Sequence, residues 1–562
     1  MPHTDPNPGV VTPRPVLTVA VLLAVCALGL GVGLGSARAI TNHEMYVVAG
    51  ARQMVESGDW LVPRVGLEPW LEKPPMLHWL CAASGWALGF HEAAMRLPSA
   101  LAAAVSVLCA AWIARRTLGP GHALLAGLVQ ATSVHVVTYG RLAEADMALA
   151  AVVAGMDVCL VGLLGLGEPA VADGERARAQ RRRIEAFRWG FWVLAGLSNL
   201  LKGPLFGMAM TLAPAGVWLA WRRDGAGARR LLHPPAMALA LALASAWPLA
   251  VAWREPGAWE LWRLHLLGRT VGEMGLLEPW WYYAGTWAWQ MLPWTPMLVI
   301  AATSLRRRRP GLDSPEALLW ALLIVPAVLL SFSKGKHHHY LIHALFAAAP
   351  LAALGTLRYG RWLLSPGPWP RAWLWLCAAA PLPAAAVLIA LRPRLGPLSE
   401  AMSLALTLGL AAVVCAAAVC GLMRRLGSSL AIAVAGVVGA IVAVHLTVLP
   451  ARDPSAKDTQ FLRELAQRIP TDSPLIAAGD LQVARVLFHL GDRATGGWDL
   501  KRTLATQGDA AELLVITWRR LEPALSAWGR WERVAQSEGS RKERGPGDRL
   551  ALYRVWRSPQ AP

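Results

Sequence analysis

The sequence predicts an α-helical polytopic membrane protein with a small α/β domain outside the membrane. Two features of the composition predict this class: 55% of the 562 residues are hydrophobic, and only 16% are charged. A third feature is that apolar segments long enough to cross a bilayer, about 20 residues each, recur along the chain. This composition excludes a soluble globular enzyme, and the glycines and prolines follow no collagen-like period.

About 13 apolar segments qualify as membrane spans by this length. They start near residues 15, 94, 121, 146, 188, 204, 234, 283, 315, 340, 371, 401 and 428. The first segment, 16–35, is interpreted as a retained span rather than a cleavable signal peptide, because further spans follow it. The stretch 76–90 is interpreted as an interfacial or re-entrant helix, since counting it as a span would place the next arginine pair on the wrong side.

Arginine clusters lie between the apolar segments of this chain, whose net charge is +18. They occur at 115–116, 181–183, 222–223 with 229–230, 306–309, 358 with 361, and 424–425. This distribution is typical of the positive-inside rule and argues against a nucleic-acid partner. With every cluster in the cytoplasm, the N-terminus lies inside. The loops 40–93, 141–146, 254–282 and 334–340 then face outward, together with those near 200 and 392–400.

The chain is expected to divide into a transmembrane domain, 1–450, and an outer domain, 451–562. The outer segment combines an amphipathic stretch at 459–468 with strand-like runs at 475–478, 513–517 and 550–555. This mixture predicts a small α/β fold. All seven cysteines lie in apolar surroundings outside this segment, so neither a disulfide framework nor a CxxC metal site is predicted.

Polar residues beside apolar spans are costly and are therefore candidates for function. Glu44 completes a Thr41-x-x-Glu44 pattern, which is also a helix capping box, and begins an amphipathic stretch expected to lie on the membrane surface. Glu72 and Lys73 precede two prolines; the alternative is a solvated ion pair. Asp146 begins a span, and its alternative role is that of an N-cap.

Cationic and aromatic residues gather in the other outward loops. Lys202 ends a span, where snorkelling to the interface is the simpler explanation. The loop 254–282 carries His265, Arg269 and an aromatic run that also suits an interfacial belt. Lys334 precedes three adjacent histidines and Tyr340; these histidines lack the i,i+4 spacing that would place two imidazoles on one helical face for a metal.

Acidic and cationic loops on one membrane face suit group transfer from a membrane-embedded phosphate ester. Cations stabilise the charge that develops on the leaving phosphate, and a carboxylate orients or deprotonates the acceptor. A long isoprenoid chain would lie among the spans and leave its phosphate at their outer ends.

The order of motifs resembles the GT-C superfamily of integral membrane glycosyltransferases, in particular the bacterial aminoarabinose transferases that modify lipid A and the related protein O-mannosyltransferases. The motifs that carry the resemblance are Glu56-Ser57-Gly58-Asp59-Trp60, Glu72-Lys73-Pro74-Pro75, Arg96-Leu97-Pro98-Ser99, Arg141-Leu142 with Asp146-Met147, Lys202-Gly203-Pro204, Glu278-Pro279-Trp280-Trp281-Tyr282-Tyr283, and Ser333-Lys334-Gly335-Lys336 with Tyr340.

The resemblance implies a sugar donor carried on a polyprenyl phosphate such as undecaprenyl phosphate. It also implies an active site on the periplasmic face of a bacterial inner membrane. Asp146 matches the family's second-loop aspartate, whereas the first-loop Asp-Glu pair falls on His43 and Glu44. Either Glu44 supplies the carboxylate, or His43 acts as the base, or the acceptor needs no strong base; Glu44 is preferred. The resemblance implies that the donor and its lipid phosphate contact Glu72, Lys73, Arg141, Lys202, His265, Arg269, Lys334 and Tyr340.

The predicted reaction is a direct displacement at the anomeric carbon, with inversion, onto a lipid A-like lipid or a protein acceptor. No cofactor is required by this prediction, and a divalent metal is the alternative. A protein O-mannosyltransferase-like enzyme is a second hypothesis. A transporter or flippase of lipid-linked sugars is a third, although no internal inverted repeat is visible. A receptor-like scaffold would explain the outer segment but not the loops.

Overall fold

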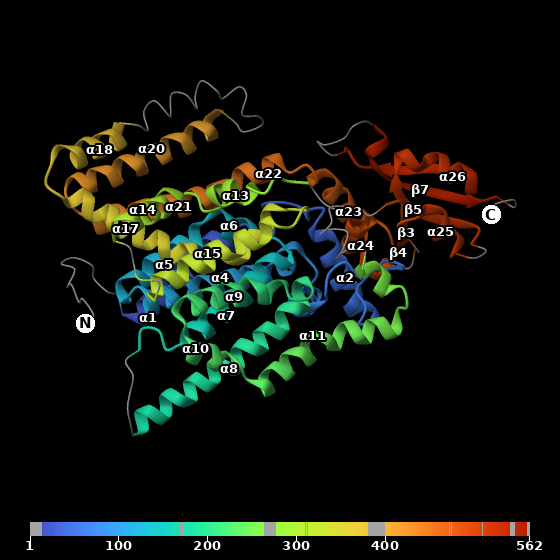
Figure 1. Cartoon of the computed structure of the whole chain (residues 1–562). Coiled ribbons are helices and arrows are strands. Elements are labelled where there is room, and N and C mark those ends of the chain that lie inside the picture. Colours follow the sequence, from blue (N-terminus) through green and yellow to red (C-terminus); the bar gives the residue numbers. More distant parts are fainter. Residues whose placement is uncertain are drawn as a thin grey trace.

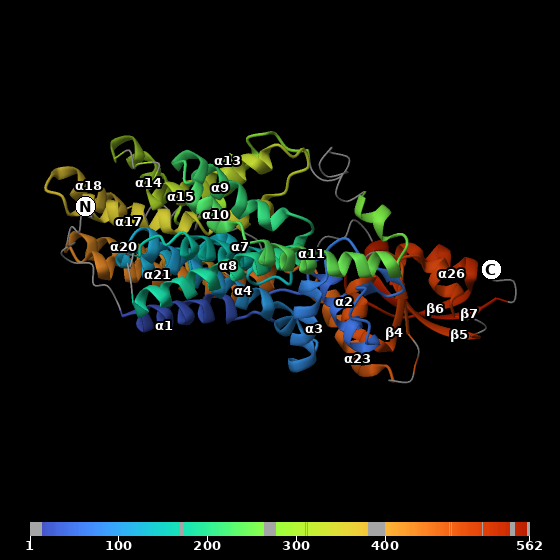
Figure 2. The same ribbon diagram turned by 60° about the horizontal axis from the view of Figure 1, so that its bottom comes forward.

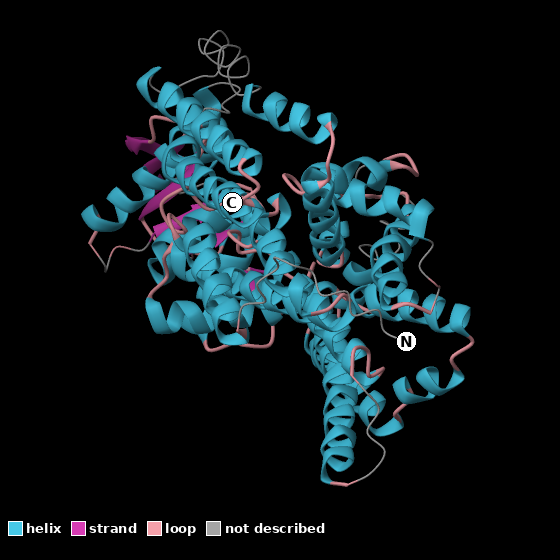
Figure 3. Ribbon diagram, turned by 90° about the vertical axis from the view of Figure 1, so that its left-hand side faces the viewer, coloured by secondary structure: helices cyan, strands magenta, loops and turns pink. Residues whose placement is uncertain are grey.

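The computed structural model describes residues 14–168, 174–263, 277–308, 311, 313–379, 400–470, 473, 475–480, 482–507, 510–539 and 546–558. It is mostly helical, with a small mixed sheet gathered at one end (Figures 1 and 3). The helical region and the C-terminal α/β unit lie at opposite ends of an elongated molecule (Figures 1 and 2).

The helical region follows the apolar segments that the sequence predicts: a helix begins within two residues of each predicted start or spans it. Its helices are α1 (Pro15–Cys26), α2 (Glu44–Ser57), α3 (Met76–Leu88), α4 (Glu92–Thr117), α5 (Ala123–Thr132), α6 (Val134–Tyr139), α7 (Ala145–Leu163), α8 (Glu175–Lys202), α9 (Phe206–Arg222), α10 (Gly225–Leu231), α11 (Pro234–Arg254), α13 (Tyr282–Gln290), α14 (Thr295–Arg308), α15 (Pro315–Ser331), α16 (Ile342–Leu345), α17 (Ala348–Leu364), α18 (Pro368–Ala379), α20 (Glu400–Leu422), α21 (Leu426–Ala443) and α22 (Leu449–Arg452).

Four described helical segments are long and apolar enough to cross a membrane by themselves: α4, α7, α11 and the continuous stretch Leu426–Arg452. A fifth span results if the bent pair His338–Leu345 and Ala348–Leu364 crosses as one unit. Four further apolar helices are shorter. Helices of this length and hydropathy are those of an integral membrane protein.

Helices α2 and α3 cover the end of the helical region that faces the C-terminal unit (Figure 2). With 13 residues, α3 is about 20 Å long at 1.5 Å per residue, too short to span a bilayer. The prediction that α2 lies on the membrane surface is wrong. Its apolar residues Val47, Val48 and Met54 are buried, because α2 packs against α3 and helix α24 (Val483–Leu490).

The C-terminal unit is a five-stranded sheet covered by helices on both faces. Its order is β4-β3-β5-β7-β6, with β3 parallel to β4 and β5, and β7 antiparallel to β5 and β6. The strands are β3 (Leu475–Ala478), β4 (Ala494–Gly497), β5 (Glu512–Trp518), β6 (Gly529–Gln536) and β7 (Leu550–Arg557). The three predicted strand-like runs coincide with β3, β5 and β7. The glycine-rich β4 and the polar β6 carry no apolar run, so the sequence did not indicate them.

Alternation along the strands assigns the two faces of this sheet. Ile476 and Ala478 pack with helices α25 (Leu500–Ala505) and α26 (Glu522–Trp528). Leu475 and Ala477 face α23 (Ala456–Arg468) and α24, in a core continuous with that of the helical region. The predicted amphipathic stretch at 459–468 lies within α23.

Polar contacts attach the C-terminal unit to the first long loop of the helical region. The amide of Ala39 donates to Asp453 Oδ2 over 2.6 Å, and Arg485 donates to Asn42 Oδ1 over 2.8 Å. Arg463 pairs with Glu92 at the start of α4. The antiparallel pair β1 (Arg64–Val65) and β2 (Glu68–Pro69) completes the attachment, since the amide of Leu67 in their turn donates to the carbonyl of Gly496 over 2.8 Å.

The turn between β1 and β2 offers a test of this attachment. Gly66 has φ +67°, and a Cβ atom there would lie 2.0 Å from the carbonyl oxygen of Gly496. Gly58 has φ +73°, but a Cβ atom there would meet nothing within 4 Å. Each Gly→Ala change should therefore cost about 1–2 kcal/mol of backbone strain. Gly66→Ala alone should also loosen the C-terminal unit, detected as faster limited proteolysis; equal rates for both variants would contradict this.

Candidate active site

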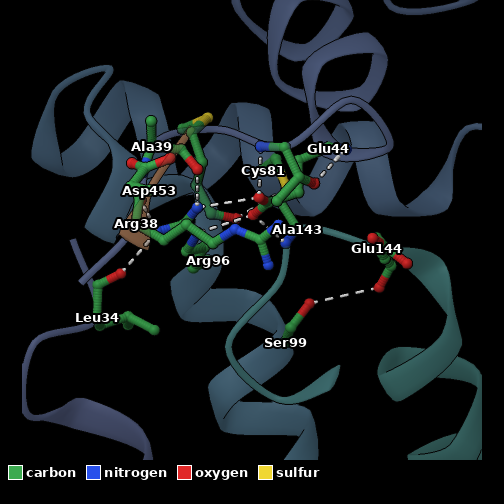
Figure 4. A network of polar contacts seen from close by, with 12 residues as sticks. Leu34, Arg38, Ala39, Glu44, Cys81, Arg96, Ser99, Ala143, Glu144 and Asp453 are labelled. Atoms are coloured by element: carbon green, nitrogen blue, oxygen red, sulfur yellow. Dashed lines mark hydrogen bonds and ion pairs between the residues drawn. The ribbon is translucent and has the colours of Figure 1, made fainter. Parts of the chain in front are cut away.

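A buried ion pair between Arg96 on α4 and Glu44 on α2 organises the loop after α1 and the loop before α7 (Figure 4). Arg96 Nε donates to Glu44 Oε1 over 2.7 Å, and its Nη2 donates to Glu44 Oε2 over 2.9 Å. The other guanidinium hydrogens reach the carbonyls of Leu34, Arg38 and Ala39. All five N–H groups of Arg96 are therefore used.

The carboxylate of Glu44 is equally saturated. Besides Arg96, it accepts the amides of Thr41 at 2.9 Å and Ala143 at 2.9 Å. The Thr41 hydroxyl accepts from the Glu44 amide at 3.3 Å, so the predicted capping box is confirmed. Burial by itself would raise the pKa of Glu44, but the charge and hydrogen bonds of Arg96 lower it below its usual value. Glu44 is thus ionised, and its hydrogen bonds connect the loop that contains Thr41 to the loop that contains Ala143.

A second buried cluster forms where the start of α7, the end of α8 and α16 meet. Lys202 pairs with Asp146, and His343 Nε2 lies 3.3 Å from Lys202 Nζ and 3.5 Å from Asp146 Oδ1. The side chains of Lys202, Asp146 and His343 are 10%, 2% and 0% exposed, respectively. The N-cap alternative for Asp146 is wrong, because Glu144 is the N-cap residue of α7. Snorkelling of Lys202 is also wrong, because its ammonium is paired inside the protein.

The aromatic ring of Tyr340 packs beside this cluster. The ammonium of Lys202 lies 4.4 Å from the centre of the Tyr340 ring, a cation–π distance. The segment before Tyr340 is held by α13, because Gln290 Nε2 donates to the His338 carbonyl over 2.9 Å and Tyr283 donates to the His337 carbonyl over 3.3 Å. These hydrogen bonds therefore hold the predicted loop 334–340 in place near Asp146.

Lys73 and Glu144 lie at the edge of the second cluster. Burial, followed by the charge of Asp146, raises the pKa of Glu144 to about 7, and Lys73 opposes this rise. Glu72, next to Lys73 in sequence, acts on another group: burial first and Glu72 second raise the pKa of Tyr46 to about 12. Glu72 and Lys73 thus have different neighbours.

The other predicted site residues stand apart from this cluster or outside the described chain. Arg141 is buried, and its guanidinium donates to the carbonyls of Gly29, Leu30 and Val32. It therefore satisfies carbonyls at the end of the first helix and does not reach Asp146 through any described contact. Lys334 is exposed, and so is His43, which lies within electrostatic reach of His338. His265 and Arg269 lie outside the described residues.

Several residues of the two clusters escaped prediction. The three adjacent histidines lack an i,i+4 pair among themselves. His339 and His343, however, have this spacing, so His343 could have been found from the sequence. Arg96 appeared only within a motif, and Glu144 only within the loop range 141–146. Within the described ranges, no group of three or more His, Cys, Asp or Glu side chains is arranged to hold a metal ion.

Comparison with known proteins confirms the predicted resemblance. A family model described as "Dolichyl-phosphate-mannose-protein mannosyltransferase" matches residues 72–168, which include Lys73 and Asp146. The undecaprenyl phosphate-alpha-4-amino-4-deoxy-L-arabinose arabinosyl transferase of Pectobacterium carotovorum is 30% identical over 314 residues, covering 54% of this chain and 52% of that protein. The protein of the same name from Pseudomonas aeruginosa is 29% identical over 337 residues, covering 57% and 58%. The chain thus matches just over half the length of these curated relatives.

The fold is similar to that of a solved crystal structure. The crystal structure of ArnT from Cupriavidus metallidurans bound to undecaprenyl phosphate aligns with a TM-score of 0.75 and 20% sequence identity, covering 96% of this chain and 97% of that one. At this identity the likeness establishes the fold, and the chemistry of the site rests on the residues described above.

The Arg96–Glu44 pair should be essential for folding. Removing one partner of a buried pair leaves the other charge uncompensated, which costs about 3–5 kcal/mol. Arg96→Ala should therefore lower the thermal midpoint of the detergent-solubilised protein sharply. Arg183→Ala, which removes a pair whose arginine is 60% exposed, should cost at most about 1 kcal/mol. A midpoint for Arg96→Ala equal to that of Arg183→Ala would refute the role of the pair.

Proposed function

We propose that this chain is a membrane glycosyltransferase that moves a sugar from a polyprenyl-phosphate carrier to an extracytoplasmic acceptor, with a lipid A-like lipid as the favoured acceptor. The observation that carries the proposal is the buried cluster of Asp146, Lys202 and His343 beside Tyr340 and Lys73. Its residues come from loops that the arginine pattern assigns to one membrane face. The relatives named above transfer an aminoarabinose carried on undecaprenyl phosphate, and the similar crystal structure contains undecaprenyl phosphate.

The charges of the cluster suit displacement of a phosphate leaving group. The ammonium of Lys202 is held between a carboxylate and an aromatic face, so it is fixed in position before any substrate arrives. A preorganised cation stabilises charge that develops on a leaving phosphate without reorganisation during the reaction. Lys73 is a second cation on the same side. In this reaction the acceptor oxygen forms a bond to the anomeric carbon, the bond from that carbon to the phosphate oxygen breaks, and the configuration inverts.

Roles of the remaining predicted residues follow from their surroundings. Asp146 holds Lys202 and orients the acceptor, while Tyr340 lines the donor side. Glu44 and Arg141 serve as anchors of the loops, because their hydrogen bonds are made to the protein itself. Glu72, Lys334, His265 and Arg269 are retained as contacts of the lipid carrier, and the exposed His43 as the alternative base.

We also propose the membrane arrangement expected from the sequence: about 13 spans by length, a transmembrane domain at 1–450 and a periplasmic domain at 451–562 in a bacterial inner membrane. The contacts of Asp453 with Ala39 and of Arg485 with Asn42 support it. They join the C-terminal unit to the first outer loop, so both belong on the same side of the membrane.

The proposed site can be tested by transfer in nanodiscs from undecaprenyl phosphate-linked aminoarabinose to lipid A, followed by mass spectrometry. Asp146→Asn and Lys202→Ala should each lower turnover by about 10²–10³-fold, the usual cost of a lost transition-state contact. Lys457→Ala, which removes an exposed lysine paired with Glu538, is the matched control and should be unaffected. Wild-type turnover in both site variants would remove this site. Movement of the lipid-linked sugar across the membrane without transfer would favour a flippase instead.

A further inference from the structure

Three tryptophan side chains hold the segment between α2 and α3, which ends directly before Glu72 and Lys73. Each indole nitrogen donates to one backbone carbonyl of this segment: Trp79 to Trp60 over 2.8 Å, Trp247 to Leu61 over 2.8 Å, and Trp262 to Leu71 over 3.0 Å. Trp247 belongs to α11 and Trp262 to the segment that follows α11. In Figures 1 and 2 this part of the chain extends toward α2 at the end of the helical region.

Ion pairs attach the first half of the same segment to the end of α11. Arg254 Nη1 and Nη2 donate to the two carboxylate oxygens of Asp59 over 3.0 and 2.8 Å, and Arg64 pairs with Glu255. These contacts lie well before Lys73 in the sequence. The hydrogen bond of Trp262 is made at the last residue of the segment, next to Glu72 and Lys73.

The hydrogen bond of Trp262 orients the backbone that leads into Lys73. The accepting carbonyl belongs to the peptide group between Leu71 and Glu72, and a peptide group is planar, so fixing its oxygen fixes the orientation of the whole group. After Lys73, the prolines 74–75 have a restricted φ, and the first of them also disfavours a helical backbone at Lys73. The position of Lys73 is therefore constrained on both sides.

A small buried core joins the segments that carry Lys73 and Lys202. Its members are Val62, Leu71, Leu200, Trp247, Val251 and Ala258, and Trp262 packs against them. Leu71 precedes Lys73 by two residues, and Leu200 precedes Lys202 by two residues. Both ammonium groups lie within electrostatic reach of His339. This core therefore sets the position of one lysine relative to the other.

We propose that Trp262 is a positioning residue, whose hydrogen bond to Leu71 holds Lys73 at the separation from Lys202 at which both ammonium groups contact one donor phosphate. This inference rests on the proposed function. Two fixed cations stabilise the charge on one leaving phosphate only while both remain within contact distance of its oxygens. Trp262 acts through Lys73 and takes no part in the bond changes.

The test compares two Trp→Phe variants of the full-length protein in nanodiscs. Each variant keeps an aromatic ring and removes one part-buried indole hydrogen bond to the same segment. In transfer from undecaprenyl phosphate-linked aminoarabinose to lipid A, Trp262→Phe should lower kcat by about 10–10²-fold, the usual cost of a misplaced group. It should also bind undecaprenyl phosphate more weakly. Trp247→Phe is the matched control, and its kcat and affinity should stay at wild-type values. The thermal midpoints of the two variants should be equal, because each loses one bond of the same kind.

A double-mutant cycle separates positioning from a general loosening of the segment. Because Trp262 acts through Lys73, Trp262→Phe should have no further effect in a chain that already carries Lys73→Ala, so the two effects are non-additive. Additive effects on kcat and on affinity for undecaprenyl phosphate would overturn the inference. Equal losses in Trp262→Phe and Trp247→Phe would overturn it as well.

Failure of the inference and failure of the proposed function give different results. Wild-type kcat and affinity in Trp262→Phe, with Lys73→Ala impaired, overturn the positioning role alone. Wild-type values in Lys73→Ala overturn the role of Lys73 in the proposed function and this inference with it. A wild-type protein that transfers no sugar overturns the proposed function, and the same cycle measured on affinity for undecaprenyl phosphate then decides the positioning role.

Discussion

The buried pair of Arg96 and Glu44 is the constraint on which the end of the helical region next to the C-terminal unit depends. Two opposite charges without access to water are stable only if their remaining hydrogen-bonding groups are also satisfied. Here the guanidinium reaches the carbonyls of Leu34, Arg38 and Ala39, and the carboxylate receives the amides of Thr41 and Ala143. One ion pair therefore joins the exit of the first helix, α2, α4 and the loop before α7.

The position of the candidate site follows from this pair. The amide of Ala143 is bound by Glu44, and Glu144 and Asp146 follow within three residues. Asp146 then meets Lys202 because α7 packs against α8, and His343 because α16 packs against α7. The same network reaches the C-terminal unit through Ala39, whose carbonyl accepts from Arg96 and whose amide donates to Asp453. Loop geometry and the attachment of the C-terminal unit are thus coupled.

Sequence reasoning identified much of the site but assigned some of its residues to the wrong neighbours. Asp146, Lys202 and Tyr340 were predicted, and the structure brings them together. Arg141 was grouped with them because it shares a loop with Asp146, yet its guanidinium points to the end of the first helix. The direction of a side chain depends on the packing of its loop, which residue type and spacing do not reveal. For the same reason α2, amphipathic enough for a membrane surface, buries its apolar side against protein.

The sequence by itself determined the membrane class, the helical segments, three of the five C-terminal strands and the loops that carry Asp146, Lys202 and Tyr340. These properties are local, because apolar runs, arginine clusters and capping boxes are contained within a few turns of chain. Only the tertiary structure decided which charges meet. Glu44 and Arg96 are 52 positions apart, and Asp146 and Lys202 are 56 apart. Their pairing depends on how the helices pack, so spacing along the chain did not reveal it.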